Sequence, residues 1–334
     1  MCACKRSSIE VCLLIRIPEM IDARRFGKET GVSGRELSSW RLRTRSLELG
    51  RRTLIMGVVN ITPDSFSDGG FFLAPEKAIA HAVRLVDEGA DILDLGAEST
   101  RPGSHAGGTE PSVSAEEEQE RLLPVVEGIL KALPHAVVSV DTYKAETARA
   151  ALKAGAEIVN DVSGFAWDPA LAGVCAEFGA GVVLTHTRGR PEQWREQPQL
   201  KPEALMATVR DGLAASVETA TAAGIANDAI ILDPGYGFGK KFGENYTLLA
   251  RQAELLDLGR PLLAGLSRKS ILGHTLAPLF GGNDALTDAR ENASLAAMTA
   301  AILNGASIVR VHAVRPAVEA ARIADAILAG SQSH

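Results

Sequence analysis

The chain has 334 residues, of which 46% are hydrophobic and only 4% aromatic, and its formal net charge is −6. A core built mainly from Ala, Val, Leu and Ile is sufficient for one large α/β domain or two smaller ones. The acidic balance argues against a nucleic-acid or anionic-membrane surface, so an anionic ligand would have to be held by local positive charge.

The cysteines and the apolar runs indicate a cytoplasmic protein. Cys2, Cys4, Cys12 and Cys175 have no His or second Cys pair at a four-ligand zinc spacing, and we interpret them as reduced thiols. No apolar run approaches the roughly 20 residues of a membrane span. The run at 11–17 is interrupted by Arg16 and lacks a small-residue cleavage site, so it is not a convincing signal peptide.

The first 37 residues have a mixed composition without a sustained period, and we expect a poorly ordered or variable N-terminal extension. Residues 40–45 then alternate apolar and basic side chains, and Leu47, Leu49 and Gly50 lead into the first core strand. This pattern predicts a β-hairpin at 38–53 that closes one end of the main fold. Residues 38–334, hairpin included, are predicted to form one barrel domain.

From Leu54 onward, short apolar runs of strand type alternate with Ala-rich helical patterns. Many of these helices begin with Pro or an acidic residue and end at Gly, as at Gly89, Gly155 and Gly179. The predicted strands are 54–60, 91–95, 137–141, 157–162, 181–186, 229–233, 261–267 and 307–312. The predicted helices are 75–88, 114–133, 145–154, 169–178, 202–223, 245–258, 288–303 and 316–328.

Eight such units over roughly 270 residues fit an α/β fold of the (β/α)8 TIM barrel class, preceded by a short N-terminal extension. The alternative is a doubly wound open sheet, which usually has fewer strands and often carries a Gly-rich dinucleotide turn after its first strand. The first turn here, residues 60–70, contains no GxGxxG pattern. We therefore predict the barrel.

Each predicted strand ends in polar or charged residues, and the active site of such a barrel lies at these ends. Any one of them has a structural alternative. Asp141 and Asp233 could cap the next helix, His186 could be a satisfied core histidine, and Lys269 could be a solvated helix start. A purely structural role for all eight strand ends together is improbable. The strand ends carry Asn60, Glu98 to Gly103, Asp141, Asn160 with Asp161, His186, Asp233, Ser267 to Lys269, and Arg310 with His312.

The strand-end residues suggest a phosphorylated heterocycle as the substrate. Arginines can grip phosphate in bidentate fashion, and carboxylates and amides can pair with the donors and acceptors of a ring edge. The acids and amide come from the middle strands, at Asp141, Asn160 and Asp233. The local positive cluster consists of Arg101, Arg268, Lys269, Arg310 and His312.

Longer motifs run through or follow several of these strand ends, at Asn60–Gly70, Asp94–Gly103, Leu232–Lys240, Gly265–Ser270 and Ile308–His312. These five segments resemble the dihydropteroate synthase family, in the family's order, and the resemblance runs from about Thr53 to the end. It implies a (β/α)8 barrel and a transferase of folate biosynthesis. The implied reaction condenses 6-hydroxymethyl-7,8-dihydropterin diphosphate with 4-aminobenzoate to 7,8-dihydropteroate and pyrophosphate.

The resemblance also implies roles for individual residues. Asp141, Lys269 and Arg310 would be catalytic. Mg²⁺ is the implied cofactor, near Asn60. The matching positions are Asp141, Asn160, Asp233 and Lys269 for pterin; Asn60, Arg310 and His312 for pyrophosphate; and Phe66, Thr100, Arg101, Pro102, Phe238 and Ser267 for aminobenzoate.

In the implied mechanism pyrophosphate leaves first, and the amine then attacks a cationic pterin methylene. Mg²⁺, Arg310 and His312 would stabilise the departing charge, and the Asp141 carboxylate would favour the cation. Because the amine is neutral at pH 7, we assign no general base. Thr187, Tyr236 and Ala313 depart from the family pattern without removing a charge from the assigned contacts.

Two other functions remain as alternatives: a pterin-binding methyltransferase barrel, and a pterin-binding paralogue without turnover. Arg310 and His312 argue against the first, because methyl transfer needs no pyrophosphate grip. The resemblance further implies small-molecule substrates, a homodimer formed by outer helices near the C-terminus, and inhibition by sulfonamides. The Ala-rich segment 293–301 is compatible with close packing of such helices.

Overall fold

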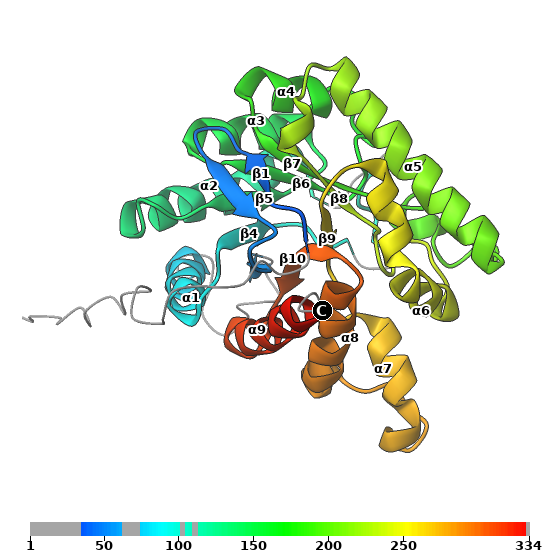
Figure 1. The fold of residues 1–334 in the computed structure, drawn as a ribbon. Coiled ribbons are helices and arrows are strands. Elements are labelled where there is room, and N and C mark those ends of the chain that lie inside the picture. The colour runs from blue at the N-terminus through cyan, green and yellow to red at the C-terminus, as the bar shows by residue number, and fades with distance from the viewer. Residues whose placement is uncertain (1–34, 62–73, 101–103, 109–112, 332–334) are drawn as a thin grey trace, which may run out of the picture. The chain divides into compact units, whose positions relative to one another are not determined.

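The computed structural model describes residues 35–61, 74–100, 104–108 and 113–331. Within them eight parallel strands form a closed barrel in the order β10-β3-β4-β5-β6-β7-β8-β9 (Figure 1). The predicted (β/α)8 barrel is confirmed. The strands are β3 (Leu54–Asn60), β4 (Ile92–Gly96), β5 (Val138–Asp141), β6 (Ile158–Asp161), β7 (Gly181–Thr185), β8 (Ile230–Asp233), β9 (Leu262–Ala264) and β10 (Ala306–Val311).

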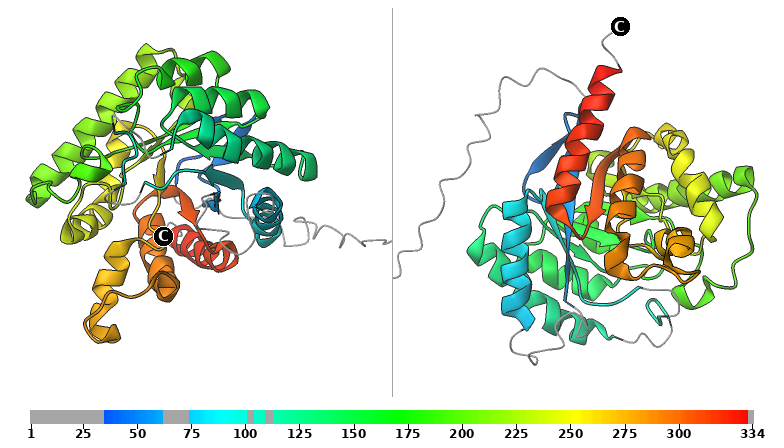
Figure 2. Two further views of the ribbon diagram at one scale, coloured as in Figure 1. Left: turned by 180° about the vertical axis from the view of Figure 1, so that it is seen from behind. Right: turned by 90° about the horizontal axis from the view of Figure 1, so that it is seen from below.

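Helices surround the barrel on its outside (Figure 2). The strands are buried on both faces, because one side packs inside the barrel and the other packs under the helices. None of the described helices is long and apolar enough to cross a membrane. The α-helices are α1 (Ala74–Glu88), α2 (Ala115–Ala132), α3 (Ala145–Ala154), α4 (Leu171–Phe178), α5 (Pro202–Ala222), α6 (Phe242–Ala250), α7 (Ser270–Leu276), α8 (Glu291–Leu303) and α9 (Val314–Gly330).

The region around β9 differs most from the sequence prediction. The sequence predicts a strand at 261–267, but β9 ends at Ala264. Arg268, in the turn that follows, has a φ of 59°, and the chain then enters helix α7, which the sequence pattern does not predict. The helix expected at 245–258 is instead α6 followed by a 3₁₀ helix. The 3₁₀ helices are η3 (Pro191–Gln193), η4 (Asn227–Ala229), η5 (Gln252–Leu258), η6 (Ala277–Phe280) and η7 (Thr287–Arg290).

An antiparallel hairpin, β1 (Ser38–Arg41) and β2 (Ser46–Leu49), packs against the N-terminal end of the barrel. Trp40 is fully buried, and its Nε1 donates a hydrogen bond of 3.0 Å to the carbonyl oxygen of Ala229, which directly precedes β8. The expected extension, residues 1–37, lies outside the described residues except for its last three. The boundary at residue 38 therefore stays a prediction.

Replacing Trp40 by alanine is expected to lower the free energy of unfolding by about 3–5 kcal/mol, because it leaves a large cavity at the closed end of the barrel. Urea denaturation would measure the loss. Leu37→Ala is the control, because the Leu37 side chain is 48% exposed and should cost little. Equal midpoints for the two variants would show that the hairpin does not contribute to barrel stability.

Candidate active site

Arg310 on β10 lies between two carboxylates at the C-terminal mouth of the barrel. Its Nε donates to Asp94 Oδ2 at 2.6 Å, and its Nη2 donates to Asp141 Oδ2 at 2.8 Å. Asp94, on β4, also accepts a hydrogen bond from Asn160 Nδ2 at 3.0 Å and one from Ser139 Oγ at 2.6 Å. We call these five residues the Arg310 network. It brings together three sequence-predicted site residues from β5, β6 and β10.

The Arg310 network shifts the ionisation of its members. Burial raises the pKa of Asp141 to about 7, and the charge of Asp94 adds to this, while Arg310 and Lys269 oppose it. Burial alone would lower the pKa of Arg310, but Asp94 and Asp141 outweigh it and raise the pKa. Arg310 is therefore a permanent cation, whereas Asp141 titrates near neutral pH.

Asp233 and Lys269 form a second group at the mouth, after β8 and β9. Asp233 Oδ1 accepts a hydrogen bond of 2.7 Å from the Gly235 amide. Lys269 Nζ lies 3.8 Å from the centroid of the Phe238 ring. Burial lowers the pKa of Lys269 to about 8 against the opposing charge of Asp233, and burial raises the pKa of Asp233.

Glycines border the carboxylates at two strand ends. A Cβ atom at Gly96 would lie 3.6 Å from Asp141 Oδ2, and one at Gly265 would lie 3.6 Å from Asp233 Oδ2. Any side chain longer than a methyl group at either position would compete with a ligand for the space beside the carboxylate. The two glycines therefore leave open space beside the carboxylates of Asp141 and Asp233 at the mouth of the barrel.

The structure describes only some of the residues that the sequence predicts to bind pyrophosphate and aminobenzoate. The backbone N–H of His312 donates to Ser267 Oγ at 3.3 Å, and His312 Nδ1 lies 3.0 Å from the same oxygen. Asn60 is exposed at the end of β3, and Thr100 is partly buried. Phe66, Arg101 and Pro102 lie outside the described residues.

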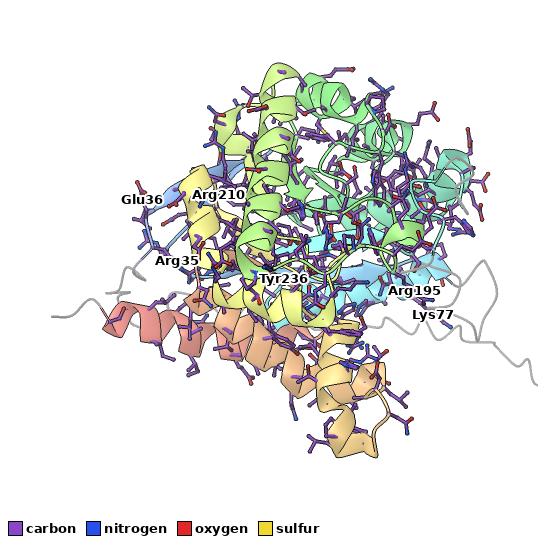
Figure 3. The ribbon with its side chains drawn as sticks, turned by 90° about the vertical axis from the view of Figure 1, so that its right-hand side faces the viewer. Arg35, Glu36, Lys77, Arg195, Arg210 and Tyr236 are labelled. Carbon is purple, nitrogen blue, oxygen red and sulfur yellow. The ribbon has the colours of Figure 1, made fainter. Side chains whose placement is uncertain are left out.

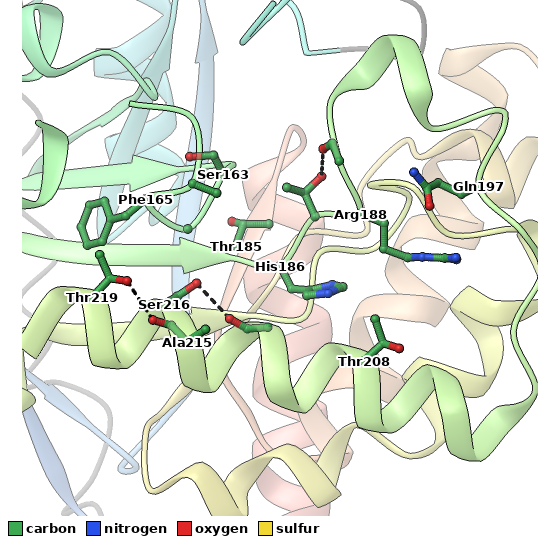
Figure 4. Close-up of a pocket in the computed structure, with 15 residues that line it drawn as sticks. Ser163, Phe165, Thr185, His186, Arg188, Gln197, Thr208, Ala215, Ser216 and Thr219 are labelled. Carbon is green, nitrogen blue, oxygen red and sulfur yellow. Dashed lines mark hydrogen bonds between the residues drawn. The ribbon is translucent and has the colours of Figure 1, made fainter. Parts of the chain in front are cut away.

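His186, although at a strand end, faces away from the Arg310 network. It lines a cavity of about 520 Å³ between β7, the loop after β6 and the face of α5 that carries Thr208 and Ser216 (Figure 4). The ring is buried, and no described group pairs with its Nδ1. Burial lowers the pKa of His186 well below its usual value, so the ring is neutral. None of the residues lining this cavity belongs to the Arg310 network.

Comparisons with known proteins agree on one family. The family of pterin binding enzymes matches residues 56–312. The dihydropteroate synthase of Mycobacterium leprae is 44% identical over 282 residues, covering 83% of this chain and 95% of that protein. That of Escherichia coli is 40% identical over 279 residues, covering 84% and 93%. The chain belongs to the dihydropteroate synthase family.

A solved structure of the family also matches this chain. The dihydropteroate synthase of Xanthomonas albilineans, solved with 4-aminobenzoic acid, superposes with a TM-score of 0.77 at 39% identity. The match covers 88% of this chain and 99% of that one. The whole barrel of this family member, and not only its motifs, is therefore shared with a dihydropteroate synthase.

Two residues of this synthase barrel were not among the predicted site residues. Asp94 opens one matching segment but lies inside a strand, where a buried structural acid is the ordinary expectation. Lys240 closes another, and its Nζ donates to the carbonyl oxygens of Gly235, His186 and Phe238 at 2.7, 3.2 and 3.4 Å. Burial lowers the pKa of Lys240 to about 7. Lys240 thus holds the loop that carries Phe238.

Two departures from the family pattern have local partners away from the mouth. Tyr236, labelled in Figure 3, is buried and donates a hydrogen bond of 2.6 Å to Gln252 Oε1. Thr187 Oγ1 donates to the Gly189 carbonyl oxygen at 3.0 Å and accepts from Trp194 Nε1 at 3.1 Å. Both side chains anchor loops, and neither removes a contact of the Arg310 network.

Proposed function

We propose that this chain condenses 6-hydroxymethyl-7,8-dihydropterin diphosphate with 4-aminobenzoate, giving 7,8-dihydropteroate and pyrophosphate in folate biosynthesis. The observation that carries the proposal is the position of Arg310, a cation held beside Asn160 and Asp141 at the barrel mouth. A cation that can bind phosphate, next to side chains that can bind a ring edge, suits a heterocyclic diphosphate. Family membership supports the same reaction.

The pterin ring is assigned to Asp141, Asn160, Asp233 and Lys269. The carbon–oxygen bond to the diphosphate breaks, and its electron pair leaves with pyrophosphate. Asp141, when ionised, stabilises the cationic methylene that remains. The amine nitrogen then forms the new carbon–nitrogen bond and releases its proton to solvent, so no side chain has to act as a strong base.

The leaving pyrophosphate is assigned to Arg310, His312 and Asn60. The described residues contain no cluster of three or more His, Cys, Asp or Glu side chains that could hold a metal alone. Mg²⁺ commonly keeps several waters and is held by one or two protein ligands together with substrate phosphates. Asn60, exposed at the end of β3, would hold the ion with the diphosphate oxygens. The ion would supply charge neutralisation there.

The aminobenzoate is assigned to Phe238, Ser267 and Thr100, with Phe66, Arg101 and Pro102 completing the set. Phe238 provides an apolar face that also contacts Lys269. Sulfonamides, as aminobenzoate mimics, are expected to inhibit.

We also assign the protein to the cytoplasm and to a homodimer formed by outer helices near the C-terminus. Supporting the dimer, Ile323 and Ile327 on α9 are 65% and 52% exposed, and Leu303 at the end of α8 is 39% exposed. Apolar side chains one helical turn apart, as on α9, form a stripe that a second copy could cover.

The rate constant kcat/KM for the pterin diphosphate is expected to have a narrow maximum between about pH 7 and 8. Asp141 loses its negative charge as the pH falls through about 7, and Lys269 loses its positive charge as the pH rises through about 8. Lys269→Arg keeps the positive charge at all accessible pH values and should remove the alkaline decline. A profile that is identical in this variant would show that Lys269 does not set the alkaline side.

The reaction is tested by measuring pyrophosphate release from the pterin diphosphate and Mg²⁺, with and without 4-aminobenzoate. Release that depends on aminobenzoate and yields dihydropteroate supports the proposal. Tight pterin binding by a folded sample without product would instead indicate a non-catalytic paralogue. Methyl transfer from a methyl-folate would indicate the methyltransferase alternative.

A further inference from the structure

Asp94 uses both of its carboxylate oxygens inside the barrel, although its side chain is completely buried. Oδ1 accepts the hydroxyl of Ser139 at 2.6 Å. Oδ2 accepts two donors, Arg310 Nε at 2.6 Å and Asn160 Nδ2 at 3.0 Å. One oxygen atom is therefore shared by a residue assigned to the pterin ring and a residue assigned to pyrophosphate.

The contact with Asp94 fixes the orientation of the Asn160 amide. A carboxylate that is ion-paired with an arginine can only accept hydrogen bonds, so the NH₂ group of Asn160 has to face it. Rotation of the amide by 180° would place its carbonyl oxygen against the carboxylate. Asn160 consequently offers its Oδ1 oxygen to a ligand, which selects N–H donors on the ring.

Asp94 also limits the freedom of Arg310. With Nε bound to Asp94 and Nη2 bound to Asp141, the guanidinium plane is set by two acids from neighbouring strands, β4 and β5. A long side chain held in this way has already lost its rotamer freedom before a ligand arrives, so binding costs less entropy. The serine contact in turn holds the carboxylate.

We propose that Asp94 is the positioning residue of this site, setting the Asn160 amide and the Arg310 guanidinium as one unit without touching substrate. The inference rests on the proposed function for the roles of Asn160 and Arg310, and adds to it the group that determines their geometry. It predicts that binding of the ring and binding of the diphosphate are both impaired by one buried substitution.

The test measures dissociation constants by calorimetry for two ligands, 6-hydroxymethyl-7,8-dihydropterin and its diphosphate with Mg²⁺. Asp94→Asn is expected to weaken binding of both by about 30-fold, since it loosens hydrogen bonds to a charged group. The matched control is Glu157→Gln, which alters an equally buried carboxylate just before β6, at the opposite end of the barrel. It should bind both ligands as the wild type does. If Asp94→Asn does not fold, Ser139→Ala is the second variant. It changes no charge, and it should weaken binding of both ligands by a smaller factor.

A double-mutant cycle separates positioning from a general structural effect. If Asp94 acts on the ring through Asn160, then Asp94→Asn should have almost no further effect on binding of the free pterin in an Asn160→Ala background. Full additivity, or wild-type binding by a folded Asp94→Asn protein, would overturn the inference. A wild-type protein that binds neither ligand would instead overturn the proposed function.

Discussion

Replacing Arg310 by alanine is expected to reduce kcat/KM for the condensation by about 1000-fold, because a preorganised cation is removed from the leaving pyrophosphate. Binding of the pterin diphosphate should weaken at least tenfold more than binding of the free pterin. The substitution also removes the charge that holds down the pKa of Asp141, so that pKa should rise and the acid side of the pH profile should move to higher pH.

Arg52→Ala is the control for Arg310→Ala. Arg52 forms an exposed ion pair with Asp91 at the other end of the barrel, and such pairs contribute at most about 1 kcal/mol. Turnover should be unchanged in this variant. Equal losses of affinity for free pterin and pterin diphosphate in Arg310→Ala would contradict the assignment of Arg310 to pyrophosphate.

Replacing Asp233 by asparagine is expected to weaken binding of the pterin itself by about 100-fold. The oxygen that accepts the Gly235 amide can be retained, so the amide NH₂ would replace the other carboxylate oxygen and face ring donors. The loop after β8 should stay folded, which separates a lost ligand contact from a lost turn. Titration of the pterin into the purified variant measures the effect.

Asp228→Asn is the matched control for Asp233→Asn, because Asp228 precedes the other end of β8 and forms an exposed ion pair with Arg41. Its affinity for pterin should equal that of the wild type. Unchanged pterin affinity in Asp233→Asn would show that Asp233 serves only to anchor the turn at Gly235.

The barrel could be predicted from the sequence because each strand is a short apolar run followed by an amphipathic helix. The limits of β3, Leu54–Asn60, agree with the prediction at both ends. The region after β9 could not be predicted, since a left-handed backbone at Arg268 has no local signal. Helix α7 is short and contains Gly273, which weakens its helical pattern.

The strand-end residues of the site could also be predicted, but their partners could not. Arg310 and Asp94 are 216 positions apart in the chain, and their contact depends on how the barrel closes and how far the strands are staggered. His186 lies at a strand end, as predicted, but its side chain faces α5, because its ring fits over Gly212. A rule that places residues at an end of the barrel does not determine the direction of their side chains.

The closure of the barrel between β8 and β9 has a thermodynamic consequence. In the described sheet these strands share the single register pair Leu232 and Leu262, whereas the other neighbours share three or more. Segments with few backbone hydrogen bonds exchange their amide protons through local opening. Asp233 and Lys269 stand on opposite sides of this seam. A molecule that contacts both would connect the two strands that share the fewest register pairs, so its binding is expected to stabilise the barrel against local opening there.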